Sequence, residues 1–235
     1  MVDKKQGSSI TKQGSQSLAK AAVPYPRDPF LSPAERKWLF LFAVLVMVLT
    51  TIPYFLGYSL EGSEWRFSGF VFGVEDGNSY IAKMLSGANG AWLFRTPYTS
   101  IHQRGVVAFL PYLMAGKLTA MPGQHEQLVV LYHSFRLAAG GLMIWMTYRF
   151  IARFSPDVSI RRWGAVLATL GSGLGWLLML IGQSEWLGSL PLEMYSPETF
   201  GFLSLYGLPH LALARAGLLA GLLVYIDSLA VSYTH

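Results

Sequence analysis

The 235 residues are 52% hydrophobic and 13% charged, whereas an ordinary soluble domain carries about a quarter charged residues. Lys and Arg number 18 against 13 Asp and Glu. They gather at the ends of apolar stretches, which indicates membrane topology and argues against a nucleic-acid partner. The absence of Cys excludes disulfides, zinc–thiolate sites, iron–sulfur clusters and thiol catalysis.

Residues 1–34 are the first predicted segment. They are rich in Ser, Gln, Lys and Pro and lack a periodic apolar pattern, which predicts a disordered basic tail. The apolar run over 38–56 is too long for a signal peptide and predicts a retained first span. Arg36 and Lys37 precede this run, and the tail with its flank carries seven bases against three acids. The positive-inside rule therefore predicts a cytoplasmic N-terminus in an inner-type membrane.

Three later apolar stretches predict further spans over 128–151, 163–181 and 209–231. Small residues spaced for close helix packing lie in the last two, at Gly171 and Gly175 and at Gly217 and Gly221.

The stretch 106–121 is ambiguous. If it crossed the membrane, the basic connection after the second long span, with Arg161 and Arg162, would lie outside, against the rule applied to the tail. The stretch is about 16 residues long and contains Pro111 and Gly116, which favours an interfacial or re-entrant helix.

The predicted fold is therefore an all-α membrane protein with about four transmembrane helices. Residues 35–235 form one module, and a long first external loop carries juxtamembrane amphipathic helices over 77–88 and 106–121. The expected partners are the lipid bilayer and further membrane-protein subunits.

The first external loop carries the main candidates for chemistry, the adjacent acids Glu75 and Asp76. One interpretation is that Asp76 caps the following helix while Glu75 favours its positive dipole end. The other is that a carboxylate at the bilayer surface acts on a membrane-embedded substrate, as a general base or as a ligand of a divalent metal.

Scattered motifs resemble the GT-C superfamily of integral-membrane glycosyltransferases, which use polyprenyl-phosphate sugars. They are an Asp-x-x-x-Tyr motif, then Ala-x-Met and Gly-x-Trp, a His, a Pro-containing apolar helix, and a Tyr-His-x-x-Arg-Leu motif on a helix that ends in further Tyr and Arg residues. The matching residues are Asp76, Tyr80, Ala82, Met84, Gly90, Trp92, His102, Pro111, Tyr132, His133, Arg136, Leu137, Tyr148 and Arg153. The resemblance covers about residues 38–230, and since relatives carry more spans, it implies an N-terminal portion or a truncated relative.

That resemblance implies a sugar transfer from a polyprenyl-phosphate donor to an acceptor on the non-cytoplasmic face. Asp76 matches the catalytic carboxylate that activates the acceptor, and Glu75 is a possible helper. Arg136 is expected to hold the donor phosphate, which arginine binds well; alternatively it reaches the interface or pairs with an acid of the outer loop. The expected substrate-binding set is completed by four residues, Tyr80, His102, Arg104 and His210.

Two other functions stay open. The chain could be a non-catalytic GT-C-like structural subunit of a larger membrane complex, in which His102 and Arg104 are ordinary solvated loop residues. Alternatively, His133 and His210 could be axial ligands in a haem- or pigment-binding subunit, although interfacial histidines are more often satisfied without a cofactor. No haem or pigment is therefore expected.

Overall fold

The computed structural model describes residues 31–232, apart from positions 97, 184, 186 and 187. The predicted disordered tail lies almost wholly outside these residues. The described elements are helical and are α2 (Pro33–Ser59), α3 (Val74–Ala88), α4 (Leu110–Gly116), α5 (Gln124–Phe154), α6 (Val158–Leu170), α7 (Gly175–Leu180), the short helix η1 (Leu192–Met194), α8 (Gly201–Gly207) and α9 (Pro209–Ser232). The predicted all-α class is confirmed for this part of the chain.

Three helices are long and apolar enough to cross a membrane: α2, α5 and α9. They confirm the predicted helices over 38–56, 128–151 and 209–231 and fit a multi-pass membrane protein. Helix α2 begins with a capping box, in which the Ser32 hydroxyl accepts from the Glu35 amide and the Glu35 carboxylate accepts from the Ser32 amide.

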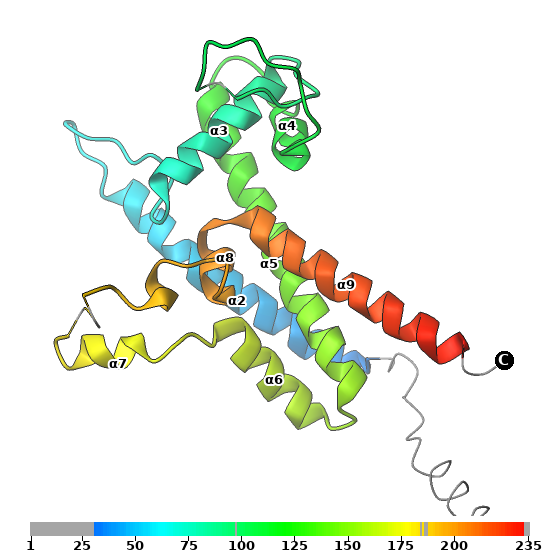
Figure 1. The fold of residues 1–235 in the computed structure, drawn as a ribbon. Coiled ribbons are helices and arrows are strands. Elements are labelled where there is room, and N and C mark those ends of the chain that lie inside the picture. The colour runs from blue at the N-terminus through cyan, green and yellow to red at the C-terminus, as the bar shows by residue number, and fades with distance from the viewer. Residues whose placement is uncertain (1–30, 97, 184, 186–187, 233–235) are drawn as a thin grey trace, which may run out of the picture.

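Helices α5 and α9 run side by side in the same direction (Figure 1). At one end the Tyr132 hydroxyl donates to the Gly207 carbonyl just before α9 (2.7 Å). At the other end Arg153 Nε lies 3.2 Å from an Asp227 carboxylate oxygen. Because the two helices are parallel, the segment that links them in sequence must run back from the end of α5 to the start of α9.

The predicted span over 163–181 is wrong as a continuous helix. Helix α6 has 13 residues and ends at Leu170, directly before the extended backbone of Gly171, and α7 has only six residues. The segment that returns from α5 to α9, called the divided return, consists of α6, residues 171–200 and α8. The apolar composition suggested one span, but the run Gly171-Ser-Gly-Leu-Gly175 interrupts the helix, since glycine there gives no side chain to stabilise it.

The glycine pairs also differ from expectation. Gly171 and Gly175 lie at the interruption instead of on one helix face. Around Gly217 and Gly221, nothing among the described residues comes within 4 Å of where a Cβ would be, so this face of α9 has no neighbour within the described chain.

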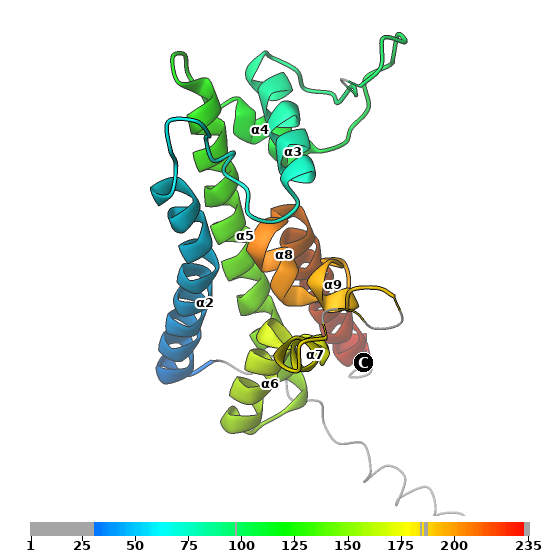
Figure 2. The ribbon, with the colours of Figure 1, turned by 90° about the vertical axis from the view of Figure 1, so that its left-hand side faces the viewer.

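Residues 60–123, called the cap, link α2 to α5 and stand over one end of the bundle (Figures 1 and 2). Helix α3 confirms the predicted helix over 77–88, with an earlier start. Helix α4 has seven residues, fewer than predicted over 106–121, and is too short to cross a bilayer. The two helices touch backbone to backbone because Gly87 faces the Leu113 carbonyl and Gly116 faces the Met84 carbonyl.

Ion pairs gather at the opposite end of the bundle. The Glu35 carboxylate accepts from Arg161 Nη1 (2.8 Å) and from the Tyr148 hydroxyl (2.9 Å). The start of α2 and the start of α6 therefore lie at the same end of the bundle. The basic residues near the start of α2 and those near the start of α6 thus lie at the same end. The positive-inside rule predicts this arrangement if 106–121 does not cross the membrane.

The contact between α3 and α4 predicts the effect of adding one methyl group. In Gly116→Ala the new Cβ would lie 1.8 Å from the Met84 carbonyl oxygen, so the helices must separate. We expect a loss of about 1–3 kcal/mol, measured as a lower melting temperature of the detergent-solubilised protein. Gly141→Ala, at an open position of α5, is the matched control and should not lower it. Equal effects of the two substitutions would contradict the close packing.

Candidate functional site

Asp76 lies in the first turn of α3 and does not cap it. The N-cap is Gly73, whose left-handed backbone (φ 57°) suits glycine, and it makes no side-chain cap. The N-cap position predicted for Asp76 is therefore wrong. Glu75 and Asp76 are both exposed and favourably placed at the positive end of the helix dipole.

Asp76 shares a face of α3 with Tyr80 and Lys83, since positions i, i+4 and i+7 lie above one another on a helix. Burial raises the pKa of Tyr80, and the carboxylate of Asp76 raises it further. Burial also lowers the pKa of Lys83, against the opposing effect of Asp76. The exposed carboxylate therefore acts electrostatically on both groups.

His210 joins this face from the first turn of α9. Its Nε2 lies 3.3 Å from the Tyr80 hydroxyl, and its Nδ1 lies 2.9 Å from the hydroxyl of Tyr112 on α4. The two tyrosine rings stack with centroids 4.6 Å apart, and burial raises the pKa of Tyr112. The carboxylate of Asp76 is within electrostatic range of the imidazole. We call Asp76, Tyr80, Lys83, Tyr112 and His210 the Asp76 cluster.

The sequence interpretation missed two members of the Asp76 cluster, Tyr112 and Lys83, and Lys83 is its cation. Its side chain is buried, and its ammonium donates to the Ser79 hydroxyl (2.6 Å) and carbonyl (3.3 Å). The ammonium also lies 4.5 Å from the Tyr80 ring centroid and 4.6 Å from that of Phe109, which are favourable cation–π distances. Its spacing of seven residues from Asp76 is the signal that could have identified it.

Arg136 lies apart from the Asp76 cluster, in the interior of the bundle. Its side chain is 0% exposed. It donates to the hydroxyls of Thr50 (3.0 Å) and Thr51 (2.7 Å) on α2, to the Leu205 carbonyl of α8 (3.2 Å) and to His133 Nδ1 (3.3 Å). The partners of this guanidinium are neutral groups of the protein, neither an acid of the outer loop nor the interface.

The bond to Leu205 belongs to a larger pattern at the end of α8. The carbonyls of a helix C-terminus lack partners within the helix. Here Leu205 accepts from Arg136, Tyr206 from the Tyr54 hydroxyl (2.5 Å) and Gly207 from the Tyr132 hydroxyl (2.7 Å). Side chains of α2 and α5 thus terminate α8 directly before Pro209 begins α9.

The remaining predicted site residues do not join the Asp76 cluster. His102 and Arg104 are exposed in the loop between α3 and α4. His133 makes two hydrogen bonds. Its Nε2 donates to the Gly69 carbonyl (2.9 Å), and its Nδ1 accepts from Arg136. Of the predicted set, the structure brings together Asp76, Tyr80 and His210, with Glu75 beside Asp76.

The fold and site define a helical protein of multi-pass membrane type, with a cap that presents a carboxylate beside a tyrosine–histidine network. No family model matches the chain, and neither does any curated protein or solved structure. Within the described residues, no group of three or more His, Cys, Asp or Glu could hold a metal ion.

The interior position of Arg136 predicts a stability effect. Arg136→Met would leave the Leu205 carbonyl without its donor and remove the link between α2, α5 and α8. We expect a loss on the order of 3 kcal/mol, or about 6–12 °C in melting temperature, measured on the detergent-solubilised protein. Arg95→Met, in the exposed loop, is the control. If both variants melted like the wild type, Arg136 would not be a structural residue.

Proposed function

We propose that the chain is a membrane glycosyltransferase module of GT-C type, which transfers a sugar from a polyprenyl-phosphate donor to an acceptor. The observation that carries the proposal is the Asp76 cluster. An exposed carboxylate stands at the start of a cap helix, one turn before Tyr80 of the same helix and within electrostatic range of His210 from α9. The GT-C resemblance implies a catalytic Asp in this place, in the first external loop next to a juxtamembrane helix.

The proposed site faces the non-cytoplasmic side. Both basic clusters, at the start of α2 and around the start of α6, lie at the end of the bundle away from the cap. The positive-inside rule assigns that end to the cytoplasm, and so the cap to the outside of the inner membrane.

In the proposed reaction, Asp76 accepts the proton of the acceptor nucleophile as that atom attacks the anomeric carbon of the sugar. The bond between this carbon and the phosphate oxygen breaks, and the polyprenyl phosphate leaves with the bonding electrons. Lys83 is the cation of the Asp76 cluster and would balance the phosphate charge. Arg136 has no place in this scheme, because it lies in the interior of the bundle, apart from the Asp76 cluster.

A structural subunit of a larger membrane complex is the second candidate, and one observation favours it. The face of α9 that carries Gly217 and Gly221 has no neighbour within the described chain, and small residues at this spacing favour packing against another helix.

The proposed function predicts the effect of neutralising Asp76. In a transfer assay with a polyprenyl-phosphate sugar and the full chain in proteoliposomes, Asp76→Asn should lower the rate at least about 100-fold, since general bases contribute 10²–10⁴. Glu64→Gln, at an exposed acid of the cap outside the Asp76 cluster, is the control and should retain most of the activity.

Melting temperatures of both variants should equal that of the wild type, because both positions are exposed. Identical background rates for wild type and Asp76→Asn would overturn the glycosyltransferase proposal and favour the structural subunit.

A further inference from the structure

A polar pocket lies where the cap meets the ends of α2 and α5, apart from the Asp76 cluster. Its volume is about 370 Å³. Since it sits where α2 ends and α5 begins, it lies at the level of lipid headgroups if both helices cross the membrane. The residues that line it are Tyr58, Glu61, Arg66, Phe67, Ser68, His125, Glu126 and Val129.

Both signs of charge face this pocket. Glu61 and Glu126 contribute two carboxylates, and Arg66 contributes one guanidinium, which leaves one negative charge in excess when His125 is neutral. Glu61 is held in place because its carboxylate accepts from the Phe67 amide (3.0 Å). Tyr58 and Phe67 add two aromatic rings in edge-to-face contact, with centroids 5.0 Å apart.

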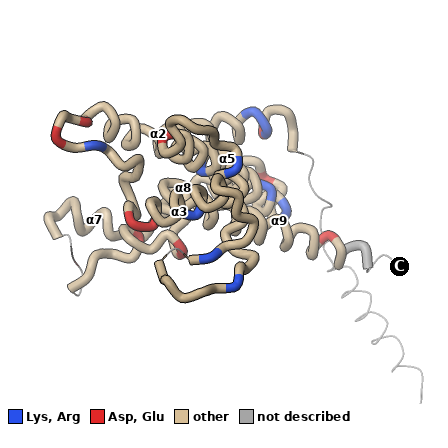
Figure 3. The backbone as a smooth tube through the Cα atoms, turned by 90° about the horizontal axis from the view of Figure 1, so that it is seen from above, with Lys and Arg blue, Asp and Glu red and all other residues tan. Residues whose placement is uncertain are grey.

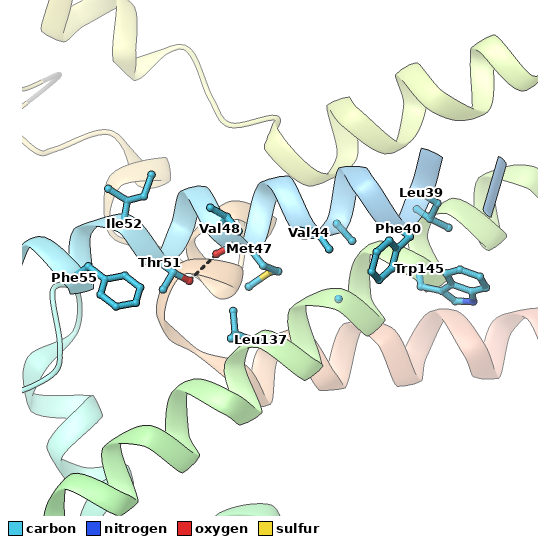
Figure 4. A pocket seen from close by; sticks show the side chains of 12 residues that line it. Leu39, Phe40, Val44, Met47, Val48, Thr51, Ile52, Phe55, Leu137 and Trp145 are labelled. Carbon is cyan, nitrogen blue, oxygen red and sulfur yellow. Dashed lines mark hydrogen bonds between the residues drawn. The ribbon is translucent and has the colours of Figure 1, made fainter. Parts of the chain in front are cut away.

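An apolar groove of about 550 Å³ lies between α2 and α5. Figure 4 shows its wall on α2, which runs from Leu39 to Phe55, and its wall on α5, with Leu137 and Trp145. The Thr51 hydroxyl donates to the Met47 carbonyl (2.6 Å). The groove therefore offers an almost wholly apolar surface to a hydrocarbon chain.

The groove and the polar pocket follow the same face of α2. Thr51 and Phe55 line the groove, Tyr58 lines the pocket, and positions i, i+4 and i+7 lie on one face of a helix. The pocket thus lies at the end of the groove nearest the cap. The two have the relative positions of a lipid headgroup and its acyl chain.

We propose that this groove and pocket bind one aminophospholipid, with an acyl chain along α2 and α5 and the headgroup in the pocket. Glu61 and Glu126 bind the ammonium, which also contacts the aromatic rings, and Arg66 binds the phosphate. The two carboxylates disfavour lipids whose headgroups carry only negative charge, including phosphatidylglycerol and polyprenyl phosphate. This lipid is therefore distinct from the donor of the proposed reaction, and its site does not depend on that reaction.

The test is native mass spectrometry of the detergent-solubilised full chain, titrated with phosphatidylethanolamine and phosphatidylglycerol of identical acyl chains and with polyprenyl phosphate. Wild type should retain phosphatidylethanolamine at roughly tenfold lower concentration than phosphatidylglycerol, a difference that one charge-assisted hydrogen bond can supply. Glu126→Gln should reduce the two lipids to near parity.

Glu64→Gln is the matched control, because Glu64 is an exposed acid of the same connection that does not line the pocket. It should keep the wild-type preference. Val44→Phe, which fills part of the groove, should lower phosphatidylethanolamine retention several-fold. Equal retention of the two phospholipids by wild type, an equal loss in Glu64→Gln and Glu126→Gln, preferred binding of polyprenyl phosphate, or an unchanged Val44→Phe would each overturn the proposal.

Discussion

A guanidinium buried between helices, with no carboxylate against it among the described residues, is the constraint on which the bundle depends. Charge is costly to hold in apolar surroundings, so the Arg136 side chain needs several polar partners at once. They come from α2, α5 and α8, as threonine hydroxyls, a histidine nitrogen and a helix-end carbonyl. One side chain therefore fixes the relative positions of three elements.

This arrangement also explains why α8 and α9 meet as they do. Leu208 alone separates the two helices, and Pro209, the first residue of α9, has no amide hydrogen to offer a preceding carbonyl. Because Arg136, Tyr54 and Tyr132 supply donors to the last carbonyls of α8, the chain can turn here without leaving them unsatisfied. The turn brings His210 to Tyr80 and Tyr112, so the Asp76 cluster is positioned by interior bonds that do not belong to it.

Apolar composition was enough to predict the long helices, because a continuous run of about 20 apolar residues is typical of a membrane-spanning helix. It did not predict the divided return, since the runs on both sides of Gly171–Gly175 are apolar and only the glycines mark the break. The candidate site was predicted in part. The spacing of Asp76 and Tyr80 marks a shared helix face, whereas the contact of Tyr80 with His210, 130 residues away, depends on tertiary packing. Arg136 was recognised as significant, but its neutral partners on other helices could not be inferred from neighbouring residues.

The divided return has a consequence for how the protein enters a membrane. At 13 residues, α6 is about 20 Å long, short of the roughly 30 Å hydrocarbon core, and α7 carries no charged side chain that would mark its end (Figure 3). Neither helix is therefore an independent unit of insertion. Arg215 of α9 donates to the carbonyls of Pro197 and Glu198 and so holds the segment before α8 against α9. Helix α9 thus helps to hold in place the segment that precedes it in the chain.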